Sequence, residues 1–332
     1  MQVVEKIKTW LSNPDRSTDS VDFEQLALDL FSFQSVNNPI YSEYLFRIGK
    51  KDYQPAGLEQ IPFLPIALFK TREVICQGFE KTLLFRSSGT GGNRSSHWIS
   101  DSSFCSAHSR LLFNEAVGEI YDMEILALLP GYEENPASSL LFMVKELARE
   151  TTRPAQFLGM NFGSLHQALK DCRNRGHRPL VFGVSHALLQ LIESGNIPDL
   201  SDACLIETGG MKGLRQEMSK TSLLEMLQDG LMPFRLISEF GMCELSSQAY
   251  AFPELYKPGP GLKVLCRNPE DLLGNARQKG RGVLNFIDLA NFSSCAFIAG
   301  EDLGEVFEDG SFRISGRMDL ADVRGCNLLF AS

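Results

Sequence analysis

The segment TLLFRSSGTGGNRSSHWIS contains the residues best suited to bind an anion. An apolar run leads into a loop of small, hydroxyl-bearing and basic residues, namely Ser87, Ser88, Gly89, Thr90, Gly91, Gly92, Asn93 and Arg94. Glycines let backbone N–H groups converge on one anion, hydroxyls add donors, and Arg94 adds positive charge. The spacing fits neither a Walker A loop nor GxGxxG, because no Gly-Lys-Ser/Thr follows and Arg94 replaces the last glycine. We predict a phosphate-binding loop, with a flexible hairpin as the alternative.

Two further segments place polar or glycine residues directly after a predicted strand. In SEFGMCELSSQ (238–248), Glu239, Gly241 and Glu244 follow a buried run, at the sheet edge where ligands of α/β proteins gather. An acid there can hold Mg²⁺ beside a nucleotide, and a solvated or capping carboxylate is the alternative. In ACLIETGGMKG, the pair Gly209 and Gly210 would let a flat base approach the backbone.

The last part of the chain offers an acid, a guanidinium and a thiol. Asp302 and Arg317 bracket a predicted hairpin with an Asp-Gly turn at 309–310, so they could reach one ligand, or they decorate a charged surface hairpin. Cys326 lies near the end of the sequence, two residues after Arg324. It is either a nucleophile or a small buried hydrophobe.

Ser185 in GVSHA stands between a predicted strand and a predicted helix, as in a nucleophile elbow. That fold places its histidine after the serine and the acid, yet no histidine follows His186. We therefore predict that Ser185 is a helix N-cap and not a hydrolase nucleophile.

The elements that must position these residues alternate between strands and helices from about 123 to 208. Asn135-Pro136 suggests the start of one helix, Ser222 with Glu225 a capping box for another, and Gly230 its C-cap. After residue 260 the pattern favours short strands. We predict an α/β fold with mostly parallel sheets flanked by helices, divided into a core at 1–260 and a small β-rich subdomain at 261–332.

Composition excludes several classes of protein. The 332 residues are 43% hydrophobic and 22% charged, as in a globular chain, and the net charge of −9 argues against nucleic acid or anionic lipid as a partner. No signal peptide or membrane-spanning run is visible, so we expect a cytoplasmic protein that is not an integral membrane protein. The eight cysteines form no CxxC, which argues against zinc and dithiol sites and favours buried free thiols.

The order of five motifs carries more information than any one of them. The motifs SSGTGGNRS, ETGGMKG, EFGMCE, AGEDLG and GRMDLADVRG occur in the order and approximate spacing of the adenylate-forming acyl ligase superfamily. Within that superfamily the chain most resembles the LuxE-type acyl-protein synthetases, which share a segment like IPFLPIALFK (61–70) and a short carboxyl end. The resemblance covers about residues 40 to 330.

The resemblance implies an activity and a set of site residues. ATP and Mg²⁺ would convert a carboxylic acid, and in this group a fatty acid, into acyl-AMP, and a cysteine would then accept the acyl group. Cys326 matches that cysteine, Glu244 the Mg²⁺-associated acid, Asp302 the ribose-binding acid and Arg317 the hinge arginine. The phosphate loop matches Ser87 to Arg94, and the adenine site matches Gly209, Gly210, Phe240 and Gly241. An acyl-accepting reductase or carrier protein would be the partner.

The chain departs from the superfamily in three places. Arg94 replaces the usual lysine of the phosphate loop, which keeps the charge but changes its geometry. Cys243 replaces a threonine expected beside the α-phosphate and is a rival acyl acceptor. Only the segment 320–332 follows Asp319, so the mobile lobe with a catalytic lysine is expected to be absent. An acyl-CoA or aryl-CoA ligase and a non-catalytic acyl-adenylate-binding protein remain the alternatives.

Overall fold

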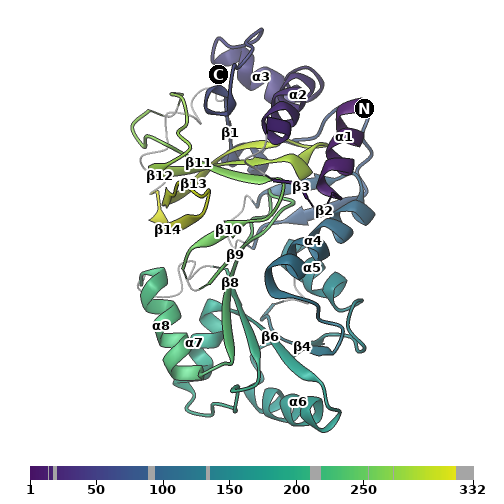
Figure 1. Ribbon diagram of the computed structural model, residues 1–332, viewed down its shortest axis with the longest axis vertical. Helices are drawn as coiled ribbons and strands as arrows, with labels where there is room; N and C mark the ends of the chain where they lie inside the picture. Colours follow the sequence, from purple (N-terminus) through teal and green to yellow (C-terminus); the bar gives the residue numbers. More distant parts are fainter. Residues whose placement is uncertain are drawn as a thin grey trace. The chain divides into compact units, whose positions relative to one another are not determined.

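The computed structural model describes residues 1–13, 15–17, 21–88, 94–131, 135–209, 218–252, 254–271 and 273–318, which fold as two compact units (Figure 1). Unit 1 contains the described parts of 1–108, 242–248 and 257–332, and unit 2 contains those of 109–241 and 249–256. The division differs from the expected boundary at residue 260. The reason is that the β-rich segment packs with the amino-terminal helices and not as a separate lobe.

The sheet of unit 2 is the parallel sheet predicted from the alternating pattern. Its strand order is β9-β8-β7-β6-β4-β5. Five of these strands run parallel to one another. They are β4 (Met123–Leu128), β5 (Gln156–Phe157), β6 (Arg178–Val184), β7 (Cys204–Thr208) and β8 (Arg235–Phe240). The short strand β9 (Ala249–Ala251) is antiparallel to β8. The carboxyl ends of the parallel strands therefore share one edge of the sheet.

Helices cover both faces of this sheet, because alternate strand residues point to opposite sides. Leu126 and Val181 belong to an apolar cluster with α6 (Phe162–Asn174), α7 (Ser185–Glu193) and α8 (Lys220–Leu231). Ile125 and Phe182 belong to the opposite cluster, with α5 (Ser139–Leu147) and the part of α4 (Ser102–Val117) that lies in unit 2. The α/β fold class is thus confirmed.

Three predicted helix boundaries are wrong. The N-cap of α5 is Ser138, whose hydroxyl accepts from Leu141 N at 3.3 Å, because Asn135 and Pro136 lie in a preceding turn. The N-cap of α8 is Ser219 and not Ser222. Gly230 lies inside α8, where an added Cβ would come within 2.7 Å of the Ile192 side chain, so it allows close helix packing.

The long strands of the unit 1 sheet pair antiparallel, and they lie where the pattern after residue 260 predicted strands. The sheet runs in the order β11 (Leu262–Arg267), β12 (Gly280–Asp288), β13 (Phe297–Val306) and β14 (Phe312–Arg317). The short β1 (Leu64–Pro65) pairs in parallel with β13. The predicted Asp-Gly turn is present between β13 and β14, with Gly310 at φ +77°. A short strand, β10 (Tyr256–Pro258), lies where the chain passes from unit 2 to unit 1.

The amino-terminal helices of unit 1 pack on this sheet. They are α1 (Gln2–Leu11), α2 (Val21–Asn37) and α3 (Pro39–Arg47), followed by the 3₁₀ turns η1 (Leu58–Gln60) and η2 (Ile66–Lys70). Phe31 of α2 meets Tyr41 of α3 and Phe297 of β13 edge to face, and Tyr41 and Phe297 stack, with ring centroids 6.0 Å apart in each pair. A third 3₁₀ turn, η3 (Leu289–Asn291), follows β12. The hairpin of β2 (Leu83–Arg86) and β3 (Ser96–Ile99) completes the unit.

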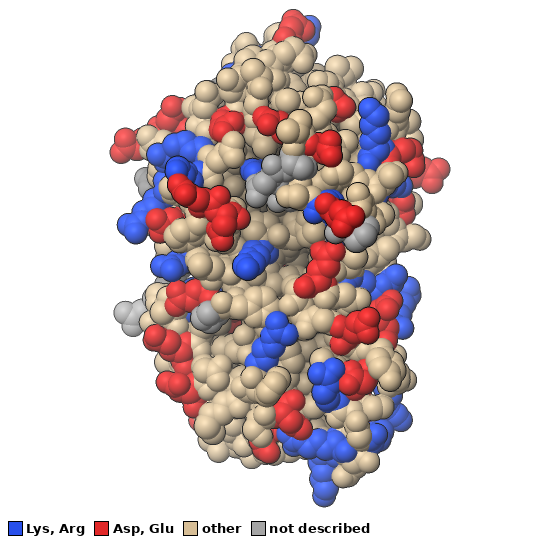
Figure 2. All heavy atoms as spheres, in the orientation of Figure 1, with Lys and Arg blue, Asp and Glu red and all other residues tan. Residues whose placement is uncertain are grey.

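The cysteines in the described part of the chain follow the expectation from the sequence. The seven cysteines within it are buried and free, as predicted. Figure 2 shows acidic and basic side chains interspersed on the face in view. Among the helices that the structure describes, none is long and apolar enough to cross a membrane.

Candidate functional site

The β2–β3 hairpin holds both ends of the predicted phosphate loop. The two ends are joined by Ser87 N–H donating to Ser95 O at 3.1 Å and Ser95 N–H donating to Ser87 Oγ at 3.0 Å. Ser88 and Arg94 are exposed at the two sides of the loop. The rest of the predicted loop, namely Gly89, Thr90, Gly91, Gly92 and Asn93, lies outside the described residues. Ser87 therefore contributes to closing the base of the loop.

The segment 242–248, which carries Cys243 and Glu244, lies against the base of this loop within unit 1. His97 of β3 contacts the Cys243 carbonyl through Nδ1 at 2.9 Å, and Cys243 Sγ lies 3.9 Å from Ser95 O. Glu244 is buried, and its carbonyl accepts a hydrogen bond of 2.7 Å from Asn291 Nδ2. Two motifs that are about 150 positions apart in the sequence are thus neighbours in space.

Asp288 fixes the following turn of this segment. Its carboxylate accepts from the backbone N–H groups of Ser246 and Ser247 at 2.8 and 2.9 Å and from the Ser247 hydroxyl at 2.7 Å. Because the Ser247 hydroxyl donates its only hydrogen to Asp288, it acts as the acceptor for His108 Nε2–H, at 2.9 Å. Burial raises the pKa of Asp288, while these donors oppose the rise. The segment that carries Glu244 is therefore held by a satisfied buried network.

The buried His108 predicts an acid-sensitive fold. Burial, with a smaller contribution from the charge of Arg16, lowers the pKa of His108 from 6.5 to about 3. Between these values the unfolded chain binds a proton that the folded chain does not, so stability is lost as the pH falls below 6.5. At pH 5 the loss from this residue is about 2 kcal/mol.

We expect the free energy of unfolding to fall by about 2 kcal/mol more in the wild type than in His108→Asn between pH 7 and pH 5. The measurement is urea unfolding at both pH values. Other titrating groups are common to both proteins and cancel in the difference. They include Glu239, whose raised pKa acts in the opposite direction. Equal pH dependence of the two proteins would contradict the assignment.

Asp302 and Arg317 are direct neighbours across the β13–β14 hairpin, as predicted. They are paired in register, with Arg317 Nε 3.7 Å from Asp302 Oδ1. Arg317 Nη2 also lies 3.4 Å from Glu301 Oε2. Sequence reasoning missed Glu301, which is buried and whose Oε1 has no hydrogen-bond partner among the described residues. An acid and a guanidinium at this spacing can bind ribose hydroxyls and phosphate together.

In unit 2 the predicted glycine turn follows β7 at the carboxyl edge of the sheet. Gly209 has φ +80°, a conformation that favours glycine, and Gly210 lies outside the described residues. Ser185 Oγ lies 2.9 Å from Gly209 O and 2.5 Å from Glu207 Oε1. Ser185 is the first residue of α7 and not its N-cap, which is Val184. The N-cap prediction is therefore wrong, and the hydroxyl instead holds the glycine turn.

A buried polar cluster, which the sequence did not reveal, lies beside this turn. Glu207 is fully buried and accepts from Ser238 Oγ at 2.7 Å and from Lys220 Nζ at 2.6 Å. Burial lowers the pKa of Lys220, but Glu207 and Tyr256 outweigh it, so the pKa is raised and the group is an ammonium. The Ser238 hydroxyl is 2.7 Å from Tyr256 OH.

Phe240 and Glu239 end β8 beside this cluster. Phe240 is buried and meets Tyr256 edge to face, with ring centroids 5.8 Å apart. Gly241 follows it. Burial raises the pKa of Glu239 to about 7, while the Thr208 hydroxyl, which donates to it, opposes the rise. The predicted adenine-binding residues Gly209, Phe240 and Gly241 therefore all follow or end parallel strands at one sheet edge.

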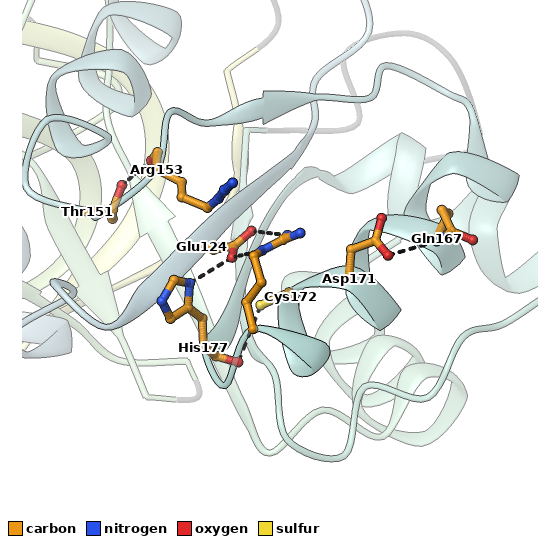
Figure 3. Close-up of polar contacts among 8 residues, drawn as sticks. Glu124, Thr151, Arg153, Gln167, Asp171, Cys172 and His177 are labelled. Atoms are coloured by element: carbon orange, nitrogen blue, oxygen red, sulfur yellow. Dashed lines mark hydrogen bonds and ion pairs between the residues drawn. The ribbon is translucent and has the colours of Figure 1, made fainter.

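A second ionic cluster in unit 2 lies at the opposite edge of the sheet and has a structural role. Figure 3 shows the His177 ring directed at the Glu124 carboxylate, with Nδ1 2.7 Å from Oε1. Arg175 donates twice to the buried Glu124 at 2.7 Å, which together with His177 lowers the pKa of that carboxyl against the effect of burial. Glu124 lies at the start of β4, where the amino ends of the parallel strands are found, so it is remote from the ligand edge.

The residues of the site fit a shared magnesium ion better than a metal cage made of protein ligands. Among the described residues, no group of three or more His, Cys, Asp or Glu side chains could hold a metal ion. Mg²⁺ is commonly bound by one or two carboxylates together with substrate phosphates. Glu244 stays the carboxylate predicted for such an ion. Cys326, the predicted acyl acceptor, lies outside the described residues.

Comparisons with known proteins bear on the fold. No family model and no curated protein matches the chain. Among solved structures, an open conformation of 2-hydroxyisobutyryl-CoA ligase in complex with 2-HIB-AMP and CoA is similar over 90% of this chain and 70% of that chain, with TM-score 0.68 and 12% identity. The ATP-bound RpMatB-BxBclM chimera B1 is similar over 70% of this chain and 47% of the chimera, with TM-score 0.54 and 15% identity.

The o-succinylbenzoate CoA synthetase (MenE) from Bacillus subtilis, in complex with the acyl-adenylate intermediate OSB-AMP, covers 73% of this chain and 50% of that chain, with TM-score 0.53 and 16% identity. The chain thus spans about half the length of the chimera and of this synthetase. At these identities the likeness concerns the fold alone. The chain shares its fold with this CoA ligase and this CoA synthetase.

Proposed function

We propose that the protein activates a carboxylic acid with ATP to form an acyl-adenylate. The observation that carries this proposal is the contact of His97 and Ser95 with Cys243, which joins the base of the predicted phosphate loop to the segment that carries Glu244. The fold shared with acid–CoA ligases supports it. The order of the five motifs along the chain supports it independently.

In the proposed reaction, a carboxylate oxygen attacks the α-phosphorus of ATP. A carbon–oxygen–phosphorus anhydride forms, the bond from the α-phosphorus to the bridging oxygen breaks, and pyrophosphate leaves. The two reactants are both anions, so the protein must position and neutralise them, and no general base is required. Mg²⁺ held beside Glu244 would neutralise phosphate charge.

The chain's own groups divide this work. Arg94, exposed at the end of the loop, supplies a guanidinium for phosphate oxygens, and the loop backbone supplies N–H donors. Asp302 and Arg317 would bind the ribose, because their side chains adjoin on the β13–β14 hairpin. Gly209 and Phe240 are the proposed contacts of the adenine.

The acyl group is then proposed to pass to the thiol of Cys326. The thiolate attacks the acyl carbonyl, a thioester forms and AMP leaves. The resemblance to LuxE-type synthetases supports this step, with a fatty acid as substrate and a reductase or carrier protein as receiver. A CoA thioester is the second candidate product, because the 2-hydroxyisobutyryl-CoA ligase with the similar fold was observed with CoA bound.

The test is pyrophosphate exchange into ATP in the presence of Mg²⁺ and a panel of carboxylic acids from short to long chain, followed by the intact mass of the protein. Exchange that depends on an acid supports adenylation. A mass increase equal to the acyl group supports transfer to the protein, and CoA-dependent acyl-CoA supports the second candidate. No exchange with any acid in the panel would refute the proposed function.

Replacing Glu244 with Gln is expected to lower acid-dependent exchange at least tenfold, equivalent to about 1.4 kcal/mol of transition-state stabilisation. The change removes one charge at nearly constant volume, and the hydrogen bond from Asn291 is made to the Glu244 backbone carbonyl, which the substitution keeps. The measurement is exchange against Mg²⁺ concentration, with the thermal transition as control. Full exchange by the variant would place the metal elsewhere.

A further inference from the structure

His97 joins two parts of unit 1 through both ring nitrogens. The Cys243 carbonyl can only accept, so Nδ1 carries the proton and donates over 2.9 Å. Nε2 is then an acceptor, and the Ser294 hydroxyl donates to it over 2.8 Å. Burial lowers the pKa of His97 to about 4, so the ring is neutral at pH 7. Phe69 of η2 packs edge to face on the ring, with centroids 5.8 Å apart.

The turn 291–295 provides the fixed point for this arrangement. Asn291 Nδ2 donates to the Glu244 carbonyl at 2.7 Å and to Cys295 O at 3.2 Å. Asn38 Nδ2 donates to Ser294 O at 2.7 Å, and Gln34 Nε2 donates to Asn291 O at 2.9 Å. The amino-terminal helices therefore hold the turn, and the turn holds both His97 and the Glu244 backbone.

The position of His97 gives these contacts a functional meaning. Arg94, the charged residue of the loop, precedes His97 by three positions, and Ser95 between them closes the loop. The loop and Glu244 must bind the phosphates of one nucleotide at the same time. An error of about 1 Å in such a geometry can cost about a hundredfold in rate.

We propose that His97 is a positioning residue that sets the distance between the phosphate loop and the Glu244 segment before ATP binds. The inference rests on the proposed function. It assigns the essential contact to the Nδ1–H group, because this ring nitrogen reaches the Cys243 carbonyl whereas Nε2 reaches Ser294. The Ser294 contact orients the ring and fixes its tautomer.

The test compares His97→Asn with His97→Gln. The Asn amide nitrogen can take the position of Nδ1 and keep the hydrogen bond to Cys243, whereas the Gln amide lies near Nε2 and can keep only the one to Ser294. We expect kcat/KM for ATP in pyrophosphate exchange to fall about tenfold or more in His97→Gln and to stay within about threefold of wild type in His97→Asn. The dissociation constant of ATP, measured by calorimetry, should follow the same order.

His108→Asn is the matched control. His108 is also a buried histidine with one hydrogen bond to the segment 242–248, but it contacts Ser247 and does not lie on β3. We expect this variant to lower the thermal transition as much as His97→Gln while reducing kcat/KM by a few-fold at most. A purely structural role for His97 would make activity follow stability in all three variants.

The outcomes separate the two proposals. Equal kcat/KM in His97→Asn and His97→Gln, in a protein whose wild type exchanges pyrophosphate, would overturn the inference alone. An equal loss of kcat/KM in His97→Gln and His108→Asn would also overturn the inference alone. Wild type that neither exchanges pyrophosphate nor binds ATP would refute the proposed function, and the inference would fall with it.

Discussion

Cys326→Ser is expected to form acyl-AMP at the wild-type rate and to lose the acyl label that hydroxylamine removes. A serine hydroxyl without an adjacent base is a far weaker nucleophile than a thiol, so the adenylate should accumulate without transfer. The measurement is intact-protein mass after incubation with ATP, Mg²⁺ and an accepted acid, before and after hydroxylamine treatment.

Cys243→Ser is the control for this prediction. Cys243 is 8% exposed and its Sγ faces Ser95 O, at the base of the phosphate loop. The variant should keep the label if this side chain only lines the phosphate site. Loss of the label in Cys243→Ser, with retention in Cys326→Ser, would move the acceptor to Cys243. Labelling of both variants would exclude a thiol acceptor at either position, and CoA thioesters without any protein label would support the CoA-ligase candidate.

Glu207→Ala is expected to lower the free energy of unfolding by about 3 to 5 kcal/mol, because it leaves the Lys220 ammonium buried without its carboxylate. The Lys220 side chain is 18% exposed and Glu207 is fully buried, so water cannot replace the lost partner well. Removing Glu207 also takes the acceptor from the hydroxyls of Ser185 and Ser238. The measurement is urea unfolding at pH 7.

Asp122→Ala is the matched control for Glu207→Ala. Asp122 pairs with Arg178 at 2.8 Å in the same unit, but the two side chains are 42% and 57% exposed. An exposed pair of this kind contributes about 0 to 1 kcal/mol. Similar losses in both variants would show that burial does not govern the Glu207 pair. The double variant Glu207→Met with Lys220→Met should recover stability, because it removes both charges together.

The period of the hydrophobic pattern and the residues typical of turns were enough to predict much of the fold. The buried run 123–129 became β4, and the Asp-Gly pair at 309–310 became the turn that brings Asp302 and Arg317 together. The predicted starts of α5 and α8 were wrong by three residues, because Ser138 and Ser219 are the N-caps in place of the residues that the local patterns favoured. Such competition is decided by which hydroxyl can reach a free N–H group.

The residues that hold the candidate site could not be predicted in the same way. His97 and Asn291 are single polar residues whose partners lie 146 and 47 positions away. No local pattern encodes such contacts. The division into units was equally hidden, because the segment 242–248 belongs to unit 1 although the strands before and after it belong to unit 2.

The buried cysteines have a consequence for chemical labelling. Burial raises the pKa of Cys76 to about 12 and those of Cys172 and Cys204 to about 11, and it also raises those of Cys266 and Cys295. Alkylating reagents attack thiolates, so these side chains react very slowly in the folded protein. These five cysteines therefore provide a nearly silent background. A fluorophore or spin label could be attached to an introduced thiol without first removing them.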